Sequence, residues 1–568
     1  MRKLLSPLLA ALLAAFITGG MLSSCAYFIM PSKSETETGT ETKEEVPADT
    51  TAAETNPVKP KGERMTGTNE IKDWQGYMPK LGELPDTITV IQNFSGNGEL
   101  MLALSLQGLT ARTKSVLCIS GHNADMWLGA IKKQVEGVKT SNVNDVWAAL
   151  EKFGDMLSRK EYVLYNEKSV NAACTIAAAE GILVASKDEA EKLEQLGYKQ
   201  AADAQGMTDA DAIRAYKNKL NTTALVQQTP SNYALRDLGI AYGLGFYFYN
   251  DGNKNEVKES EEIHGYIDEG GIVFGWGPGD EYQHVKIKAN HGLITVPSDH
   301  AWNLSLFSAF PREQMEQIND YAECITTAAD GKHYVALMMT DGDNVQWMVN
   351  DFNNPKWFGN AERGSIPMAW MIPPTLLDAA PQTMKWLYLQ QTENDVFVNA
   401  LSGTGYFYPT ELKSGAMDKQ IQKLGYYMDK CDFDTITIMD NTVPSQKLLD
   451  KYASIDKLKG GVLFTYPDKY AGAKGKILWS GDKPFISVRN AIWEVNVDSF
   501  AQSVAKSIKK QGYDITTADA YSVIVVHCWS HTYADAVEFA KKLSLLDDKI
   551  EFVRVDQLVK LVADNVKH

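Results

Sequence analysis

Short apolar runs alternate with amphipathic stretches along the carboxyl-terminal half of the chain. The apolar runs predict buried strands, and apolar positions one helical turn apart predict helices. The predicted strands are 335–339, 367–372, 396–401, 435–439, 461–465, 485–488, 523–526 and 551–554. Helical spacings fall between several of them, at 417–428, 500–509 and 533–543. This alternation predicts a TIM-like (β/α)-barrel of seven or eight strands over residues 319–568.

The region before the predicted barrel mixes the two patterns less regularly. Strand-like runs occur at 87–92, 115–119, 162–165, 182–184 and 271–274, and helical spacings at 143–157 and 170–179. We therefore expect one or more α/β domains over residues 67–318, so the fold class is α/β throughout.

The chain begins with the features of a signal peptide. Arg2 and Lys3 precede an apolar run, residues 8–17, that is too short to span a bilayer. The sequence Leu22-Ser23-Ser24-Cys25 then resembles a bacterial lipobox. This resemblance implies cleavage before Cys25 and lipid attachment to it, which would hold the protein outside the cytoplasm at the cell membrane or envelope. An uncleaved anchor helix is the alternative.

Residues 26–66 are rich in Ser, Thr, Glu and Pro and contain few large apolar side chains. Such a segment cannot bury enough surface to offset its chain entropy. We expect a disordered tether between the lipid anchor and the folded part.

Charge and cysteine content narrow the range of partners. The net charge is −16 and no basic run occurs beyond the leader, which disfavours a nucleic-acid partner. An uncharged carbohydrate is compatible with this charge. Beyond Cys25 the cysteines are Cys118, Cys174, Cys324, Cys431 and Cys528. They are widely spaced, mostly in apolar surroundings, and form no CxxC pair. We expect buried thiols rather than a disulfide framework or a zinc site.

The stretch 403–409, Gly-Thr-Gly-Tyr-Phe-Tyr-Pro, combines backbone freedom with aromatic rings. Gly403 and Gly405 allow the backbone to approach another group closely. In an extended segment Tyr406 and Tyr408 project to one side and Phe407 to the other. We therefore expect the two tyrosines to line a solvent-accessible pocket while Phe407 is buried. An aromatic turn that belongs only to the core is the alternative.

These residues match the signature of the GxGYxYP family of putative glycoside hydrolases. The sequence Asp341-Gly342-Asp343-Asn344 and the stretch 275–277 also look like that family, and the resemblance extends over roughly residues 70–560. It implies a carbohydrate substrate and hydrolysis of glycosidic bonds. Only the signature positions Gly403, Gly405, Tyr406 and Tyr408 can be carried over, as substrate-binding residues.

Acidic side chains follow several of the predicted barrel strands. Active sites of such barrels lie at the carboxyl ends of the strands. Glycoside hydrolysis needs two carboxyl groups, one as acid and one as base or nucleophile. The catalytic candidates are Asp341, Asp343, Asp440 and Glu494. The substrate-binding candidates, besides the signature residues, are Asn344, Arg489, His527, Trp276 and Trp302.

Each candidate also has a structural interpretation. Asp341 continues the alternation of residues 335, 337 and 339, which we expect to point into the barrel. Asp343 precedes a helical stretch and would serve equally as its N-cap. Asp440 would serve equally in a turn. Glu494 follows Trp493, so it is either an acid whose pKa is raised by apolar surroundings or a solvated loop carboxylate.

The glycine-rich stretch 275–281 superficially resembles a phosphate-binding loop. Pro278 removes a backbone donor that such a loop needs, and we expect no apolar-periodic helix after it. Phosphate binding is therefore not predicted. Trp276 in this loop would stack on a sugar or pack within the loop, and Trp302 would do the same.

A metal-dependent reaction is the second candidate. His527 and His531 with Asp341 or Asp343 would make a divalent-metal site that resembles polysaccharide deacetylases in composition. No HExxH or GxSxG motif occurs, and Val345 and Gln346 do not suit a calcium loop. We predict a cofactor-free, lipid-anchored glycoside hydrolase. The alternatives are a metal-dependent polysaccharide deacetylase and a non-catalytic glycan-binding lipoprotein.

Overall fold

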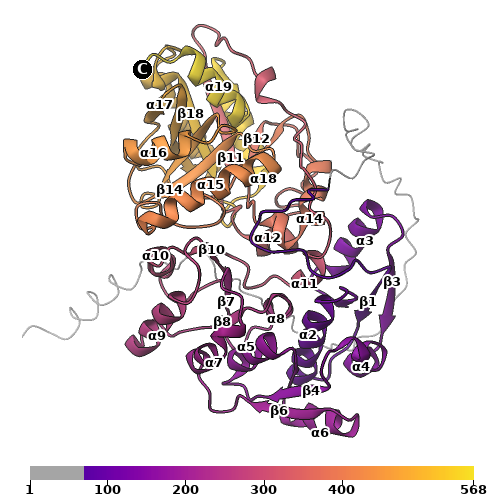
Figure 1. Ribbon diagram of the computed structural model, residues 1–568. Helices are drawn as coiled ribbons and strands as arrows, with labels where there is room; N and C mark the ends of the chain where they lie inside the picture. The colour runs from indigo at the N-terminus through magenta and orange to yellow at the C-terminus, as the bar shows by residue number, and fades with distance from the viewer. Residues whose placement is uncertain (1–69) are drawn as a thin grey trace, which may run out of the picture. The chain divides into compact units, whose positions relative to one another are not determined.

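The regular strand–helix alternation folds into a closed parallel barrel in the computed structural model, which describes residues 70–568 (Figure 1). Its strands are β11 (His333–Met339), β12 (Met368–Ile372), β13 (Asp395–Asn399), β14 (Thr435–Asp440), β15 (Gly460–Thr465), β17 (Lys483–Ile492) and β18 (Tyr521–Val526). They follow one another around the ring in this order, except that β16 lies outside it, and β11 pairs with both β18 and β12. The predicted α/β barrel is confirmed, with seven strands in the ring.

The predicted eighth strand lies outside the ring. Strand β19 (Ile550–Phe552) pairs with the beginning of β11, at residues His333, Tyr334 and Val335. β12 joins β11 only at Met338 and Met339, so the start of β11 is left open for β19. A further strand, β16 (Ile477–Ser480), is antiparallel to β17.

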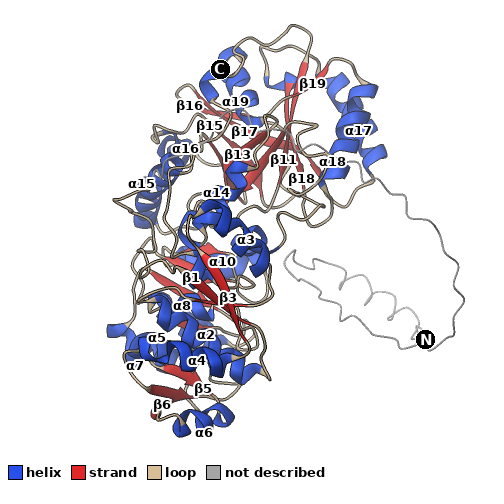
Figure 2. Cartoon of the chain, turned by 90° about the vertical axis from the view of Figure 1, so that its right-hand side faces the viewer, coloured by secondary structure: helices blue, strands red, loops and turns tan. Residues whose placement is uncertain are grey.

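Helices surround the barrel strands, as Figure 2 shows in blue around red. They are α12 (Val345–Asn350), α13 (Leu376–Ala379), α14 (Pro381–Leu389), α15 (Ser414–Lys430), α16 (Gln446–Ala453), α17 (Val497–Gln511), α18 (Tyr533–Leu546) and α19 (Val555–Asn565). Alternate strand residues fall into two hydrophobic clusters. Ala336 and Met338 belong to the cluster shared by all seven strands, which is the barrel interior. Val335, Leu337 and Met339 belong to the cluster that includes α14–α18.

This alternation corrects one prediction. We expected Asp341 to point inward because it continues the alternation of Val335, Leu337 and Met339, but these three residues face the helices. β11 ends at Met339, and Asp341 has a φ angle of 61°, so the chain has left the extended conformation before Asp341. The direction of its side chain is therefore set by the loop.

The amino-terminal part contains three separate parallel sheets, in the orders β2-β1-β3, β5-β4-β6 and β10-β9-β7-β8. Their strands are β1 (Thr87–Ile91), β2 (Leu117–Ile119), β3 (Lys139–Val143), β4 (Glu161–Leu164), β5 (Leu183–Ala185), β6 (Lys199–Asp203), β7 (Ala224–Gln227), β8 (Gly245–Tyr247), β9 (Ile272–Gly275) and β10 (Ile294–Val296). The helices are α2 (Asn97–Ala111), α3 (Ala124–Gln134), α4 (Val146–Phe153), α5 (Val170–Glu180), α6 (Lys187–Gln195), α7 (Asp209–Tyr216), α8 (Arg236–Tyr242), α9 (Lys254–His264), α10 (Glu281–Asn290) and α11 (Leu304–Phe307). The α/β class predicted for this region is confirmed.

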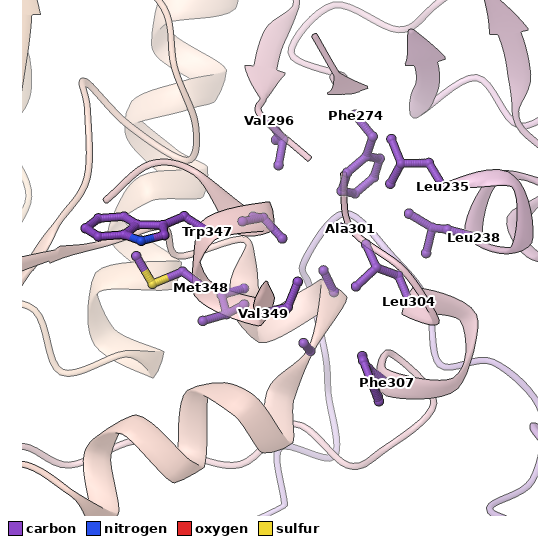
Figure 3. Packing of buried hydrophobic residues seen from close by; sticks show 14 of the residues in the cluster. Leu235, Leu238, Phe274, Val296, Ala301, Leu304, Phe307, Trp347, Met348 and Val349 are labelled. Atoms are coloured by element: carbon purple, nitrogen blue, oxygen red, sulfur yellow. The ribbon is translucent and has the colours of Figure 1, made fainter. Parts of the chain in front are cut away.

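Helix α12, which begins directly after Asn344, packs against the amino-terminal part. One hydrophobic cluster contains Trp347, Met348 and Val349 of α12 together with Leu235, Leu238, Phe274, Val296, Ala301, Leu304 and Phe307 (Figure 3). Hydrogen bonds join the same elements, because Gln346 N donates to Pro297 O at 3.4 Å and Asn350 Nδ2 donates to His300 O at 2.9 Å. The loop after β11 is therefore held between the barrel and the third sheet.

The five cysteines in the described part of the chain are free and buried, as predicted. Within residues 70–568, none of the helices has the length and apolar character needed to cross a membrane. The predicted signal peptide, Cys25 and the tether up to residue 66 lie outside the described residues.

Candidate active site

The signature loop, residues 403–409, is buried over its whole length. Tyr406 N donates to Thr295 O at 2.7 Å and Thr295 N donates to Tyr406 O at 3.0 Å, so the loop pairs with β10. A Cβ atom on Gly405 would stand 2.7 Å from Thr295 O. The close approach that we predicted for the glycines is present, and the group approached is the backbone of β10. Phe407 packs against Gly403 in the same way. A Cβ atom on Gly403 would stand 2.7 Å from Cε1 of the Phe407 ring.

The prediction that the two tyrosines line a solvent-accessible pocket is wrong. Tyr406 is 2% exposed and Tyr408 is fully buried, as is Phe407. The amino-terminal part covers them through β10 and α10, which strand alternation within the loop does not reveal. The two rings do share one site, because their hydroxyl groups are 2.6 Å apart.

The tyrosine hydroxyls lead to a carboxyl group. Tyr406 Oη donates to Glu281 Oε1 at 2.6 Å. Glu281 is the first residue of α10, and Asp280 caps that helix by accepting a hydrogen bond from Gln283 N. Glu281 is only 9% exposed. A residue of the third amino-terminal sheet region thus lies against the signature loop of the barrel.

Burial raises the pKa of Glu281 from 4.5 to about 7. The hydrogen bond from Tyr406 opposes this shift, and the negative charges of Asp341 and Asp280 add to it. A carboxyl group with such a pKa carries its proton at near-neutral pH and can release it, as a general acid must.

Glu281 was missed by sequence reasoning because we expected no helix after the glycine-rich loop. Helix α10 is present, and its buried face consists of Glu281, His284, Val285, Lys288 and Ala289. Most of these residues are polar, so the face gives no apolar periodicity. The signal that was available is Asp280, a good N-cap residue directly after a strand and a glycine-rich turn.

Asp341 and Asp343 follow β11 beside Glu281. The φ angle of 61° at Asp341 is uncommon for a residue with a side chain, and such strain concentrates at functional sites. Its carboxylate accepts a hydrogen bond from Thr340 Oγ1 and lies 4.0 Å from His527 Nε2, and its side chain keeps 13% exposure. The loop after the first barrel strand therefore presents one carboxylate to solvent at the barrel mouth.

Asp343 is buried, and its environment holds its pKa well above the usual value. Burial is the largest cause, followed by the charge of Asp341, and the charge of Glu281 also contributes. The N-cap of α12 is Asn344 rather than Asp343, and its side chain makes no cap hydrogen bond. Glu281, Asp341 and Asp343 act on one another electrostatically, and we call them the acidic cluster.

Asn344 lies at the base of the same loop. Its Nδ2 donates to Asp341 O at 3.2 Å, and this hydrogen bond stabilises the backbone of Asp341 in its positive-φ conformation. Its Oδ1 is buried without a hydrogen-bond partner in residues 70–568. We predicted a substrate contact for Asn344, and the structure gives it a position next to the acidic cluster.

His527 lies beyond the end of β18 and continues the inward alternation of Val523 and Val525. Its ring stacks on Trp493 with centroids 3.6 Å apart, and Nδ1 is 2.9 Å from Ser530 Oγ. Burial lowers the pKa of His527, and the nearby Asp341 charge opposes that shift.

Tyr470, from the loop between β15 and β16, completes the group. Its ring packs on Phe464 at 5.1 Å and edge-on to Trp493 at 5.0 Å. Burial raises its pKa, and so do the charges of Asp341, Glu281 and Asp343. The sequence offered no signal for Tyr470, because it lies in an irregular loop with a positive φ angle.

Two of the predicted catalytic carboxylates do not join this group. Asp440 is buried and accepts hydrogen bonds from Thr410 N at 2.9 Å, Thr410 Oγ1 at 2.6 Å and Asn441 N at 2.7 Å. Both of its oxygens are used to hold the chain just after the signature loop, so the turn interpretation describes it. Glu494 has a side chain that is 68% exposed and pairs with Lys469 at 3.2 Å. The apolar surroundings that we considered for Glu494 are absent.

Three residues that we predicted to contact the substrate, Arg489, Trp302 and Trp276, lie outside the acidic cluster. Arg489 lies within β17, which continues to Ile492, four residues beyond the predicted strand end, so Arg489 is not at the barrel mouth. Trp302 stacks on His122 at 4.0 Å. Trp276 is half-buried, lies edge-on to His284 at 4.2 Å and stacks on Tyr406 at 6.3 Å. Of the three, only Trp276 borders the acidic cluster.

The metal hypothesis needs His531 beside His527, and the structure separates their roles. His531 Nε2 accepts a hydrogen bond from Val495 N at 3.4 Å, and Nδ1 lies 3.5 Å from Asp535 Oδ2. In the described part of the chain, no three or more His, Cys, Asp or Glu side chains are grouped so as to hold a metal ion.

The geometry therefore assembles carboxyl groups in different environments at one end of the barrel. Glu281 is buried and hydrogen-bonded to a tyrosine, whereas Asp341 is partly open to solvent beside His527. Pairs of carboxyl groups in contrasting environments can divide the roles of acid and base. This arrangement suits reactions that protonate a leaving group while a second carboxylate supports the attack.

Four successive regions of the chain match protein-family models. Residues 331–563 match the model described as "GxGYxYP putative glycoside hydrolase C-terminal domain". The first, second and third amino-terminal domains of the same family match residues 87–155, 160–221 and 221–309. A search of curated proteins finds no match.

One solved structure is similar over most of the chain. It is a crystal structure of a putative hydrolase from Bacteroides thetaiotaomicron, with 24% sequence identity and a TM-score of 0.76. The alignment covers 86% of this chain and 97% of that one. At this level of identity the likeness establishes a shared fold.

Proposed function

The chain belongs to the GxGYxYP family of putative glycoside hydrolases, and from this premise we propose that it hydrolyses a glycosidic bond at the mouth of its barrel. Glu281 is the general acid and Asp341 is the second carboxyl group. Tyr406 positions Glu281, and Asp343 and His527 set the electrostatic environment of Asp341.

The observation that carries this proposal is the burial of Glu281 against Tyr406 of the signature loop, in a group that also contains Asp341. This burial raises the pKa of Glu281 to about 7. In glycoside hydrolysis the acid gives its proton to the glycosidic oxygen as the bond to the anomeric carbon breaks. The second carboxylate supports the incoming nucleophile and the positive charge on the sugar ring. Asp341, with its partial exposure, can approach a sugar that enters from solvent.

The proposal predicts that two isosteric substitutions strongly reduce turnover without unfolding the protein. Glu281→Gln and Asp341→Asn each remove one ionisable oxygen with little change in volume. We expect each to reduce turnover by about a hundredfold or more, the usual scale for a lost acid or base. The measurement is release of reducing ends from a panel of polysaccharides, with circular dichroism as the check on folding.

Glu261→Gln, on the exposed face of α9 in the same region as Glu281, is the matched control and should hydrolyse like the parent. Undiminished hydrolysis in both Glu281→Gln and Asp341→Asn would remove these residues from the mechanism. Glycan affinity without turnover on any member of the panel would favour a binding protein instead.

We also propose that the protein acts outside the cytoplasm while anchored by lipid at Cys25. The support is the sequence of the first 25 residues and the polar segment behind it. A long tether would let the barrel reach a glycan away from the membrane surface.

A further inference from the structure

Trp493, which stacks on His527, also lines a cleft outside the acidic cluster. This cleft has a volume of about 620 Å³, and its walls include Asp468, Lys469, Lys474, Arg489, Trp493 and Gln511. They come from the loop between β15 and β16, from the end of β17 and the loop after it, and from α17. Ligand sites for small molecules have volumes of this order.

Cations outnumber carboxylates among the side chains that line the cleft, although the chain as a whole is strongly negative. Lys469, Lys474 and Arg489 line it with Asp468 as the single carboxylate, whereas the whole chain has a net charge of −16. Within residues 70–568, Lys474 forms no ion pair and is exposed. Cations in the lining of a cleft favour an anionic ligand where that ligand can replace the carboxylates now paired with them.

Two further carboxylates stand at the rim. Glu494 pairs with Lys469 at 3.2 Å, and both side chains are more than half exposed. Asp519 lies 3.9 Å from Arg489. Exposed ion pairs of this kind contribute little free energy, so Lys469 can exchange Glu494 for a ligand at small cost.

Arg489 supplies a second, independent indication. Its side chain is only 9% exposed, and Nη2 donates to Ala518 O at 2.9 Å and Tyr521 O at 3.2 Å. These bonds fix the guanidinium, yet Nε is buried with no hydrogen-bond partner among the described residues. Gly475 packs against Nε, because a Cβ atom on Gly475 would stand 2.4 Å from it, so the guanidinium is a fixed positive charge in the wall of the cleft.

Trp493 is shared by the cleft and the candidate active site. The ring of Trp493 stacks on His527 at 3.6 Å, and His527 Nε2 lies 4.0 Å from Asp341 Oδ2. Trp493 also lines the cleft. A chain of sugars bound at the acidic cluster would reach the cleft with its neighbouring residues.

We propose that the cleft binds an anionic sugar residue, so that the substrate of this protein is an acidic glycan bearing carboxylate or sulfate groups. Lys469, Lys474 and Arg489 contact the anionic group, and Trp493 provides a flat apolar wall for the ring. This inference rests on the proposed glycosidase function and specifies its substrate class.

A nucleic acid is a poorer ligand for these walls. Nucleic-acid affinity arises from many phosphate contacts along an extended basic surface, and this cleft offers three cations in an acidic protein. A sugar of one or two charged units matches both the number of cations and the volume.

The test measures binding by titration calorimetry to the full chain carrying Glu281→Gln, so that hydrolysis does not consume the ligand. The probes are a galacturonate oligosaccharide, its methyl ester, a chondroitin sulfate oligosaccharide and a single-stranded oligodeoxynucleotide. We expect an acidic oligosaccharide to bind at least about tenfold more tightly than the uncharged ester. Preference for galacturonate shows that carboxylate is sufficient for recognition. Tighter binding of chondroitin sulfate, which carries both carboxylate and sulfate, shows that sulfate contributes.

Substitutions then locate the binding. Lys474→Gln should weaken binding of the acidic probe about three- to tenfold and reduce its salt dependence, whereas Lys474→Arg should retain it. Glu494→Gln should strengthen it, because Lys469 loses its competing partner. Lys258→Gln, exposed on α9, is the charge-matched control and should have no effect.

Equal affinity for the acid and its ester, or indifference to Lys474→Gln, would overturn the proposal. Equal or tighter binding of the oligodeoxynucleotide would overturn it in favour of a nucleic-acid site. These results are independent of turnover. If the parent protein binds acidic glycans in the cleft but cleaves none, the catalytic proposal fails while the binding site stands.

Discussion

Glu281 is placed where a carboxyl group is difficult to ionise, and this single residue links the family signature to a chemical role. The amino-terminal part provides the carboxyl group, and the barrel provides Tyr406, which donates a hydrogen bond to it. Tyr408 adds a second hydroxyl, 2.6 Å from that of Tyr406. In the proposed reaction Tyr406 is therefore a positioning residue for Glu281.

The raised pKa of Glu281 predicts a specific dependence of stability on pH. The folded protein holds this proton up to about pH 7, whereas the unfolded chain releases it near pH 4.5. The contribution of Glu281 to the free energy of unfolding is therefore complete below about pH 4.5. It decreases by about 3 kcal/mol as the pH rises from 4.5 to about 7.

Glu281→Gln lacks this titration, so its stability relative to the parent should increase between pH 5 and pH 8. Urea denaturation of both proteins at the two pH values measures the change. The comparison cancels other buried groups such as Asp434, whose pKa burial also raises to about 7. A difference in unfolding free energy that is the same at both pH values would contradict the assignment.

Tyr406→Phe tests the hydrogen bond to Glu281. This bond stabilises the ionised form and lowers the pKa of Glu281, so its removal should raise that pKa further. The alkaline limb of the pH–rate profile should move upward by about one pH unit, on the scale of a hydrogen bond to a charged group.

Tyr408→Phe is the matched control, because its hydroxyl contacts Tyr406 and not Glu281 in this structure. Its alkaline limb should move less. An alkaline limb that stays in place in Tyr406→Phe would mean that another group controls it.

At the scale of elements, the signature loop joins the barrel to the third amino-terminal sheet. Its backbone pairs with β10, and its tyrosines contact the start of α10. The two glycines are needed because the loop passes directly against β10 and Phe407. The motif is therefore a structural connection as well as a part of the candidate active site.

Gly405→Ala should weaken this connection. The added Cβ would stand 2.7 Å from Thr295 O and 2.9 Å from Ile294 Cγ2, so the loop must move away from β10. We expect a loss of about 1–3 kcal/mol in unfolding free energy, as for other overpacked sites. Chemical denaturation measures it.

Gly425→Ala within α15 is the matched control. Its Cβ would meet Ile455 at 3.7 Å, an ordinary contact, and alanine favours the helix. This variant should be as stable as the parent or more stable, by up to about 1 kcal/mol. Equal effects of the two substitutions would show that the loop has room at Gly405.

At the scale of the whole molecule, the candidate active site needs both parts of the folded chain. Asp341, Asp343, Tyr406 and His527 come from the barrel, and Glu281 and Trp276 come from the amino-terminal part. The matched family models cover both parts. The amino-terminal domains therefore contribute side chains to the candidate active site.

The lipid anchor is a prediction that belongs to this scale. Cys25→Ser removes the only sulfur to which the lipobox resemblance assigns a lipid. We expect the variant to leave the membrane fraction and to lack incorporated fatty acid, as measured by metabolic labelling in the producing cell. Retained labelling in Cys25→Ser would contradict the anchor, and Cys118→Ser, at a buried thiol, is the control that should keep its label.

The sequence by itself determined the barrel, because apolar runs and helical spacings are local patterns. They can be recognised without knowing which residues are in contact in the fold. It also placed Asp341, Asp343 and His527 after strands that were predicted correctly. It assigned Arg489 to a strand end because the extension of β17 to Ile492 crosses a bulge that breaks the apolar pattern.

Only the tertiary structure decided which carboxyl groups meet. Glu281 and Tyr406 are separated by 125 positions in the chain, and Glu281 lies on a helix whose buried face is mostly polar. Periodicity cannot detect such a helix, since its buried positions do not differ in polarity from exposed ones. The same limit applies to burial of Tyr406 and exposure of Glu494, because both depend on what another part of the chain covers.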